Sequence, residues 1–246
     1  MKNLLNLGLF ILLVAGLACA ASAAEVTITK NVVTISGVDI ALDDPFTVEV
    51  SLFDANLGLY VLLSTVTISE TTPAQLTLDV GEYQFTEVNL PQGFTPSVNP
   101  ILLSITDPAA VETVTFTNVV RFGCTLGFWK NHEEAWPAAY DPATSTIAGA
   151  GFVYPDLDTT LLMDALKFKG GKGLEGGAKI LLRQSVAALF NEAAFGQDYV
   201  SIGDLVADVN AALASGDRTA MTTVAEELDV NNNGFCPGVV SGTPGT

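Results

Sequence analysis

The hydrophobic pattern of this chain changes at one place, residues 123–136, which read GCTLGFWKNHEEAW. Upstream of this segment, apolar and polar residues alternate in short runs, a period of two that predicts β-strands. Downstream, apolar residues recur every three or four positions, which predicts amphipathic helices. We therefore expect a strand-rich half followed by a helical half, with this segment opening the second.

The strand-rich half extends over residues 24–120. Alternating runs occur at residues 26–29, 46–52, 65–68, 76–78, 83–85 and 114–117, and Asp, Asn, Pro and Gly residues separate them. No helical stretch lies between these runs. Short strands spaced in this way predict an antiparallel β-sandwich of the prealbumin or immunoglobulin type.

Two segments of this half resemble a known family. Residues 80–87 (VGEYQFTE) and 91–94 (PQGF) are similar to the G-x-Y-x-[FIL]-x-E…P-x-G-[FY] signature of the prealbumin-like repeat of bacterial adhesins and pilins, called Cna B-type or SpaA-like. Residues 114–118 (VTFTN) resemble the last strand of that repeat. The resemblance implies a compact sandwich that serves as a stalk, a spacer or a ligand-presenting module.

Many members of that family join a lysine of the first strand to an asparagine of the last, with a buried acid as catalyst. The matching residues here are Lys30, Asn118 and Glu87. Strand alternation supports the match independently, because it places each of the three on an apolar face. Burial would lower the pKa of Lys30 and leave a neutral amine as the nucleophile. In the alternative, Lys30 reaches solvent from a strand end and Glu87 is a carboxylate at the rim.

The N-terminus predicts export. Lys2 precedes an apolar stretch at residues 4–17, and residues 21–23 (ASA) form a small-x-small cleavage site. This arrangement indicates a signal peptide over residues 1–23, cleaved after Ala23. A lipoprotein site at Cys19 is the alternative, but Gly16 stands where such sites usually have leucine. No later segment approaches the roughly 20 apolar residues of a membrane span. Residues 241–246 indicate a flexible tail without an anchor, so we expect a secreted protein.

Cleavage removes one cysteine and leaves Cys124 and Cys236. In an oxidising compartment, two cysteines most simply form one disulfide. They bracket the predicted helical domain, residues 121–240. The alternative is a pair of free, buried thiols.

The charge balance restricts the partners. The formal net charge is −17, from 27 acidic and 10 basic residues. Such a field repels nucleic acids and anionic membrane surfaces. The remaining partner classes are an extracellular protein or a glycan.

Residues 123–136 also resemble the G-C-T-x-G-[FY]-W-K-N-H module that opens a domain in many secreted bacterial proteins. That module has no agreed activity, and Leu126 stands here where proline is common. The spacing predicts a short helix whose aromatic residues anchor the core. The alternative makes Trp129 and Trp136 a platform for a sugar ring, with His132 and Glu133 at its edge.

The helical half should contain a small bundle. Helical patterns follow Asp158 as far as residue 166 and extend over residues 180–193, 202–213 and 217–228. Residues 167–179 contain five glycines and four basic residues, which predicts a mobile loop. Residues 229–234 (DVNNNG) fit the first half of a calcium loop, with Asp229, Asn231 and Asn233 as ligands. The twelfth position would be Val240 instead of glutamate, so a plain turn that directs Cys236 towards Cys124 is the other interpretation.

No catalytic constellation is evident. The chain has one histidine and no G-x-S-x-G motif, which argues against a nucleophilic hydrolase. A glycosidase with two carboxylates is the remaining enzymatic alternative, but Glu133 and Glu134 are adjacent and diverge on a helix. The leading hypothesis is a secreted, non-catalytic structural or adhesive protein, in which a β-sandwich spacer presents a helical interaction module. A glycan-binding module built on Trp129 and Trp136 is the alternative. No cofactor is predicted beyond the calcium alternative.

Overall fold

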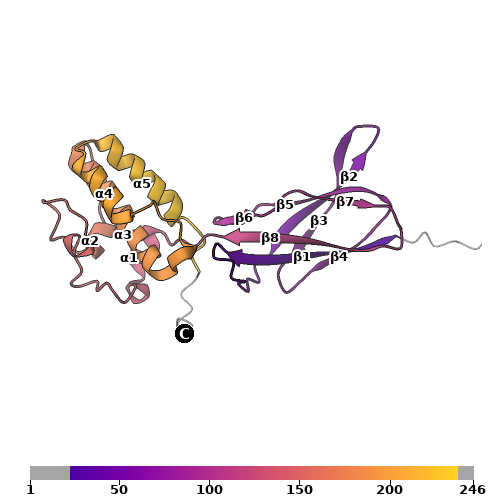
Figure 1. The fold of residues 1–246 in the computed structure, drawn as a ribbon, viewed down its shortest axis with the longest axis horizontal. Helices are drawn as coiled ribbons and strands as arrows, with labels where there is room; N and C mark the ends of the chain where they lie inside the picture. The colour runs from indigo at the N-terminus through magenta and orange to yellow at the C-terminus, as the bar shows by residue number, and fades with distance from the viewer. Residues whose placement is uncertain (1–22, 238–246) are drawn as a thin grey trace, which may run out of the picture.

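A computed structural model describes residues 23–237 (Figure 1). The predicted signal peptide, apart from its last residue, and the predicted tail lie outside this range. The strands occupy one end of the elongated molecule and the helices the other. Each half has its own cluster of buried apolar side chains. Within residues 23–237, no helix is long and apolar enough to cross a membrane.

The strand-rich half is a β-sandwich, as predicted. Its two four-stranded sheets have the orders β4-β1-β8-β6 and β3-β2-β5-β7. The inner faces hold the alternating apolar residues that the sequence pattern identified. The strands are β1 (Ala24–Thr34), β2 (Phe46–Asp54), β3 (Leu59–Ile68), β4 (Ala74–Leu78), β5 (Gly81–Val88), β6 (Phe94–Pro96), β7 (Ile101–Ile105) and β8 (Val111–Val120).

The first and last strands of the sandwich pair in parallel. In this pair, Lys30 lies beside Phe116 and Val32 lies beside Asn118. The other strand pairs of both sheets are antiparallel. Alternation in a sequence carries no information on strand direction, so the sequence pattern did not indicate this pair. Its consequence is that two strands far apart in the chain become neighbours along ten residues.

The second half is helical and closed by the predicted disulfide between Cys124 and Cys236, whose Cα atoms are 4.7 Å apart. The two longest helices pack against each other and form the centre of the bundle. The helices are α1 (Leu126–Asn131), α2 (Leu162–Leu166), α3 (Gly173–Phe195), α4 (Leu205–Ala214) and α5 (Arg218–Asn232), with 3-10 turns η1 (Glu133–Ala135), η2 (Ala148–Ala150) and η3 (Gly196–Asp198).

The mobile loop predicted for residues 167–179 is wrong from Gly173 onwards, because α3 begins there. Its glycines permit close contacts. A Cβ atom at Gly176 would collide with the backbone of Gly171, and one at Gly177 would lie 2.9 Å from a side-chain carbon of Arg218. Close packing therefore outweighs the low helix propensity of glycine, which destabilises a helix by about 1 kcal/mol per residue relative to alanine.

Residues after α5 return to the end of the sandwich. The Phe235 amide donates to the Arg121 carbonyl at 2.9 Å. The Phe235 ring lies 5.3 Å from that of Phe94 and 6.2 Å from that of Phe122. A Cβ atom at Gly93 would collide with the Phe235 amide nitrogen, so this position requires glycine. The segment that carries Cys236 therefore contacts both halves of the molecule.

Candidate functional site

Three strands bring Lys30, Glu87 and Asn118 into the core of the sandwich. Lys30 on β1 and Asn118 on β8 point inward from neighbouring strands, and Glu87 faces them from β5 of the opposite sheet. Their exposed fractions are 6%, 2% and 0%. Lys30 and Asn118 are diagonal neighbours in the parallel register, a separation that a long side chain spans. The alternative placement of Lys30 and Glu87 at the solvent is wrong.

A short ion pair joins two of these groups. The Lys30 ammonium donates to Glu87 Oε1 at 2.6 Å, and it lies 4.2 Å from the centre of the Phe46 ring. Burial lowers the pKa of Lys30, while the hydrogen bond and charge of Glu87 and the charge of Glu70 partly oppose that shift. The environment therefore favours the neutral amine more than water does.

The side-chain amide of Asn118 is buried without hydrogen-bond partners among residues 23–237. Neither Asn118 Oδ1 nor Asn118 Nδ2 has a hydrogen-bond partner among residues 23–237, and Glu87 Oε2 lacks one as well. Leaving a buried polar group unpaired costs about 1–3 kcal/mol. A stable core rarely tolerates three such atoms together, so this cluster differs from ordinary packing.

Glu70 supports the edge of the site and was missed by sequence reasoning. Its carboxylate accepts from the Val32 amide and from the Leu42 amide, both at 2.7 Å. The residue thereby ties the segment after β1 back onto that strand, two positions from Lys30. An acidic side chain two residues after the predicted strand at residues 65–68 was the only available signal.

The structure does not support the alternative of a sugar platform, because both tryptophans belong to the helical core. Trp129 is 2% exposed and Trp136 is 8% exposed. Both rings pack on Phe190, with centroid distances of 5.5 and 4.4 Å. The Trp136 indole N–H donates to the Trp129 carbonyl at 2.8 Å. Neither indole offers a face to a sugar ring, and the structure supports the interpretation as core anchors.

The two polar residues assigned to that platform lie at the surface. His132 Nδ1 is 2.8 Å from Glu134 Oε1, and its ring lies 4.7 Å from that of Phe128. This hydrogen bond lowers the pKa of the Glu134 carboxyl. Glu133 is exposed, in the turn after α1. These contacts hold the C-terminal end of α1 in place.

Residues 229–234 do not form the loop that the calcium alternative requires. Helix α5 continues through Asn232, so Asp229 and Asn231 lie on a helix and cannot wrap around an ion. The Asp229 carboxylate accepts from Gln184 Nε2 at 2.6 Å, and Asn233 donates to the Asp229 carbonyl at 2.7 Å. Over residues 23–237, no group of three or more His, Cys, Asp or Glu side chains is placed to hold a metal.

A buried polar network centred on Asn191 organises the start of the helical half. Asn191 Oδ1 accepts from the Cys124 amide at 2.8 Å and from the Trp129 indole at 3.1 Å. Asn191 Nδ2 donates to the Cys124 carbonyl and to Asn232 Oδ1, both at 2.9 Å. Tyr199 donates to the same Asn232 oxygen. Sequence reasoning missed this network, although a lone asparagine among apolar residues of a long helix was a visible signal.

No family model matches the sequence, and no curated protein is significantly similar to it. Among solved structures, the chain is similar to a streptococcal ancillary pilin, with 14% identity and a TM-score of 0.32 over 42% of this chain and 34% of that one. It is also similar to the minor pilin GBS52 of Streptococcus agalactiae, with 16% identity and a TM-score of 0.32 over 40% and 45% of the two chains. For the pilus backbone protein of Streptococcus pneumoniae, the values are 19%, 0.29, 42% and 35%. The chain thus spans less than half the length of each of these proteins.

Proposed function

We propose that this chain is a secreted structural or adhesive protein, in which a crosslinked β-sandwich spacer presents a helical interaction module. The crosslink is an amide bond between the side chains of Lys30 and Asn118. One observation carries the proposal: Lys30, Glu87 and Asn118 are buried together, and both polar atoms of the Asn118 amide lack partners among residues 23–237. The division into residues 24–120 and 121–240 is part of the same proposal, and the two separate cores support it.

The chemistry of this crosslink balances without any cofactor. The neutral Lys30 amine attacks Cγ of Asn118 and forms a C–N bond. Glu87 accepts a proton from the attacking nitrogen and returns it to the departing amide nitrogen. Ammonia leaves as the C–N bond of the original amide breaks. The products are one secondary amide and one ammonia, with no net oxidation or reduction.

Secretion is supported by the disulfide. A bond between Cys124 and Cys236 forms and persists in oxidising compartments, and it is rare in the cytosol. It ties both ends of the helical half to the end of β8, so the helices form one closed unit beyond the spacer. A closed unit at the end of a rod is suited to contact with an external partner.

Intact mass measurement tests the crosslink. The mature, non-reduced protein should be lighter than its sequence by one ammonia, in addition to the two hydrogens removed by the disulfide. Glu87→Gln should retain the ammonia, because the proton carrier is gone. Glu82→Gln is the matched control, since Glu82 lies on the same strand but is exposed. Wild-type protein without this mass loss would refute the crosslinked spacer.

A further inference from the structure

The hairpin formed by β2 and β3 exposes a group of apolar side chains. Figure 1 shows its tip projecting away from the rest of the sandwich. Single exposed apolar residues are ordinary on a protein surface, but a cluster of them usually marks an interaction site. Within residues 53–63, six large apolar side chains are between 39% and 63% exposed: Phe53, Leu57, Leu59, Val61, Leu62 and Leu63.

Strand β3 is also an open edge of its sheet. Its strand partner within residues 23–237 is β2 alone. In the same range, no turn or loop hydrogen bond uses the backbone of residues 59–68. An antiparallel strand directs alternate N–H and C=O groups to its two sides, so those on the outer side of β3 are free to pair with another strand.

The length of β3 distinguishes it from the other outermost strands. It has ten residues, whereas β4, β6 and β7 have five, three and five. Short edge strands are one of the usual protections against pairing with another chain. A bulge remains as a protection, because it leaves Leu63 without a partner on β2 and bends the strand there. An edge shortened in this way favours a reversible association over a permanent one.

The absence of charge indicates which chain fits this edge. Residues 57–69 contain no acidic residue, no basic residue and no proline, although the whole chain has a net charge of −17. Two copies of the chain therefore repel each other over most of their surface, but they can align their β3 strands without placing like charges opposite each other. An acidic or basic peptide would find no complementary charge on this strand.

A second copy is also favoured over a segment of the same chain. Residue 237, the last one described, lies where the two halves meet, whereas the hairpin lies nearer the free end of the sandwich (Figure 1). A second copy brings the same apolar residues and the same open backbone groups to the contact. A two-fold axis normal to the sheet makes the two strands antiparallel, which is the direction used by the other pairs of this sheet.

We propose that the β3 strands of two copies of this chain pair with each other and join their sheets edge to edge. Backbone hydrogen bonds hold the pair, and Leu59, Val61 and Leu62 lose part of their exposure to water. This inference goes beyond the proposed function, because the association of two spacers does not require the crosslink within each of them.

Sedimentation equilibrium of the mature, disulfide-bonded protein tests the association. We expect a reversible equilibrium between monomer and dimer. Added salt should tighten the dimer, because it screens the repulsion between two copies of charge −17 without weakening an uncharged contact. A contact between basic residues of one copy and acidic residues of another would weaken under the same conditions.

A charged side chain on β3 tests the position of the contact. Leu62→Lys should weaken the dimer by at least about tenfold, because it places two ammonium groups close together in the middle of the uncharged run. Leu62 is 54% exposed, so the monomer should keep its fold, which circular dichroism verifies. Leu102→Lys is the matched control and should leave the dimer unchanged. Leu102 is 63% exposed and lies on β7, at the opposite edge of the same sheet.

Hydrogen exchange locates the contact in the unmodified protein. Amides of β3 should exchange more slowly at high protein concentration than at low concentration, and amides of β7 should not change. A protein that stays monomeric, a dimer that weakens as salt rises, or a dimer without this added protection of β3 would overturn the proposal. So would a dimer that Leu62→Lys leaves unchanged or that Leu102→Lys weakens equally.

Discussion

Removing the disulfide should destabilise the helical half and leave the sandwich intact. The bond between Cys124 and Cys236 closes a loop of 112 residues that contains every helix of the bundle. In the loop-entropy model, a closure of this length contributes about 4.8 kcal/mol at 25 °C by restricting the unfolded chain. The variant Cys124→Ala/Cys236→Ala should lose most of that stabilisation.

Urea unfolding followed by tryptophan fluorescence measures this loss selectively. Both tryptophans of the chain lie in the helical core, so their emission reports on that half. With a urea dependence of about 2 kcal/mol per molar, the midpoint should fall by about 2 M. None of the sandwich strands lies inside the loop, although Phe235 packs on Phe94 at the end of the sandwich. The sandwich should therefore keep its own transition, as followed by circular dichroism in the β-sheet region.

A single substitution distinguishes the stability that comes from loop closure from the stability that comes from packing of the Cys124 side chain. Cys124 is 1% exposed and packs in the core, whereas Cys236 is only partly buried. Cys236→Ala opens the loop and leaves the Cys124 side chain in place, so it should reproduce most of the loss. If its midpoint stayed within about 0.5 M of wild type, loop closure would not be what stabilises the bundle.

Two further predictions concern buried polar groups. Asn191→Leu should destabilise the helical half by about 3–6 kcal/mol, because a buried indole N–H, a backbone amide and a carbonyl lose their partner. A loss below about 1 kcal/mol in urea unfolding would contradict the structural role of the Asn191 network. In Asn118→Ala, Lys30 remains a free amine whose pKa is lowered from 10.5 by burial. Between that lowered pKa and 10.5, the unfolded chain binds more protons than the folded one, so the stability of the sandwich should rise with pH. Lys30→Met/Asn118→Ala lacks this titration, and identical pH slopes in the two variants would show that the pKa of Lys30 is not lowered.

Strand alternation in the sequence predicted the inward side chains of the sandwich correctly. The pattern around Lys30 placed this residue on the same face as Ile28 and Val32, and all three are buried. A period of two is a property of the backbone, so it identifies faces reliably. The alternation does not identify which strands pair with each other. The pairing of β1 with β8, which brings Lys30 next to Asn118, depends on contacts between residues about 90 positions apart in the chain.

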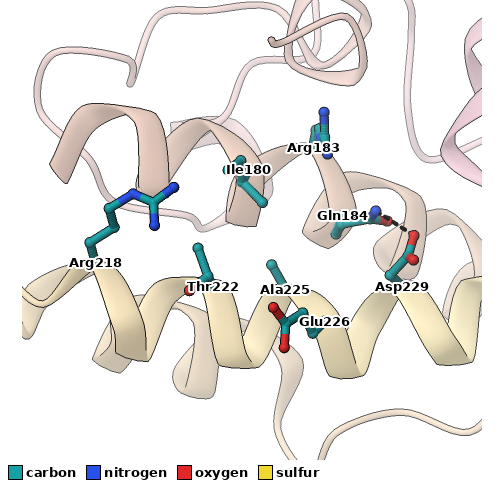
Figure 2. Close-up of a pocket in the computed structure, with 8 residues that line it drawn as sticks. All are labelled: Ile180, Arg183, Gln184, Arg218, Thr222, Ala225, Glu226 and Asp229. Carbon is teal, nitrogen blue, oxygen red and sulfur yellow. Dashed lines mark hydrogen bonds between the residues drawn. The ribbon is translucent and has the colours of Figure 1, made fainter. Parts of the chain in front are cut away.

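The helical half shows where local signals fail. Residues 229–232 have a calcium-loop composition, yet they form the last turn of α5 because Asn231 and Asn232 are buried against the bundle. Gly176 and Gly177 argue for a loop by propensity, but they allow α3 to pack closely against its neighbours. The groove between α3 and α5, lined by Arg183 and Arg218 among others, exists only once these helices are adjacent (Figure 2), so no single segment of the sequence could reveal it.

The two cores differ in whether their buried polar groups have hydrogen-bond partners, and this difference bears on function. In the helical core, Asn191 and Asn232 have partners for both side-chain polar atoms, which is the usual state of a structural network. In the sandwich core, both polar atoms of the Asn118 side chain and one oxygen of Glu87 have no partner among residues 23–237. Selection for stability alone would replace such groups by apolar residues, because each unpaired group costs about 1–3 kcal/mol. The proposed bond between Lys30 and Asn118 would remove one amine and one amide N–H donor from the core, and it would thereby relieve part of this unfavourable burial.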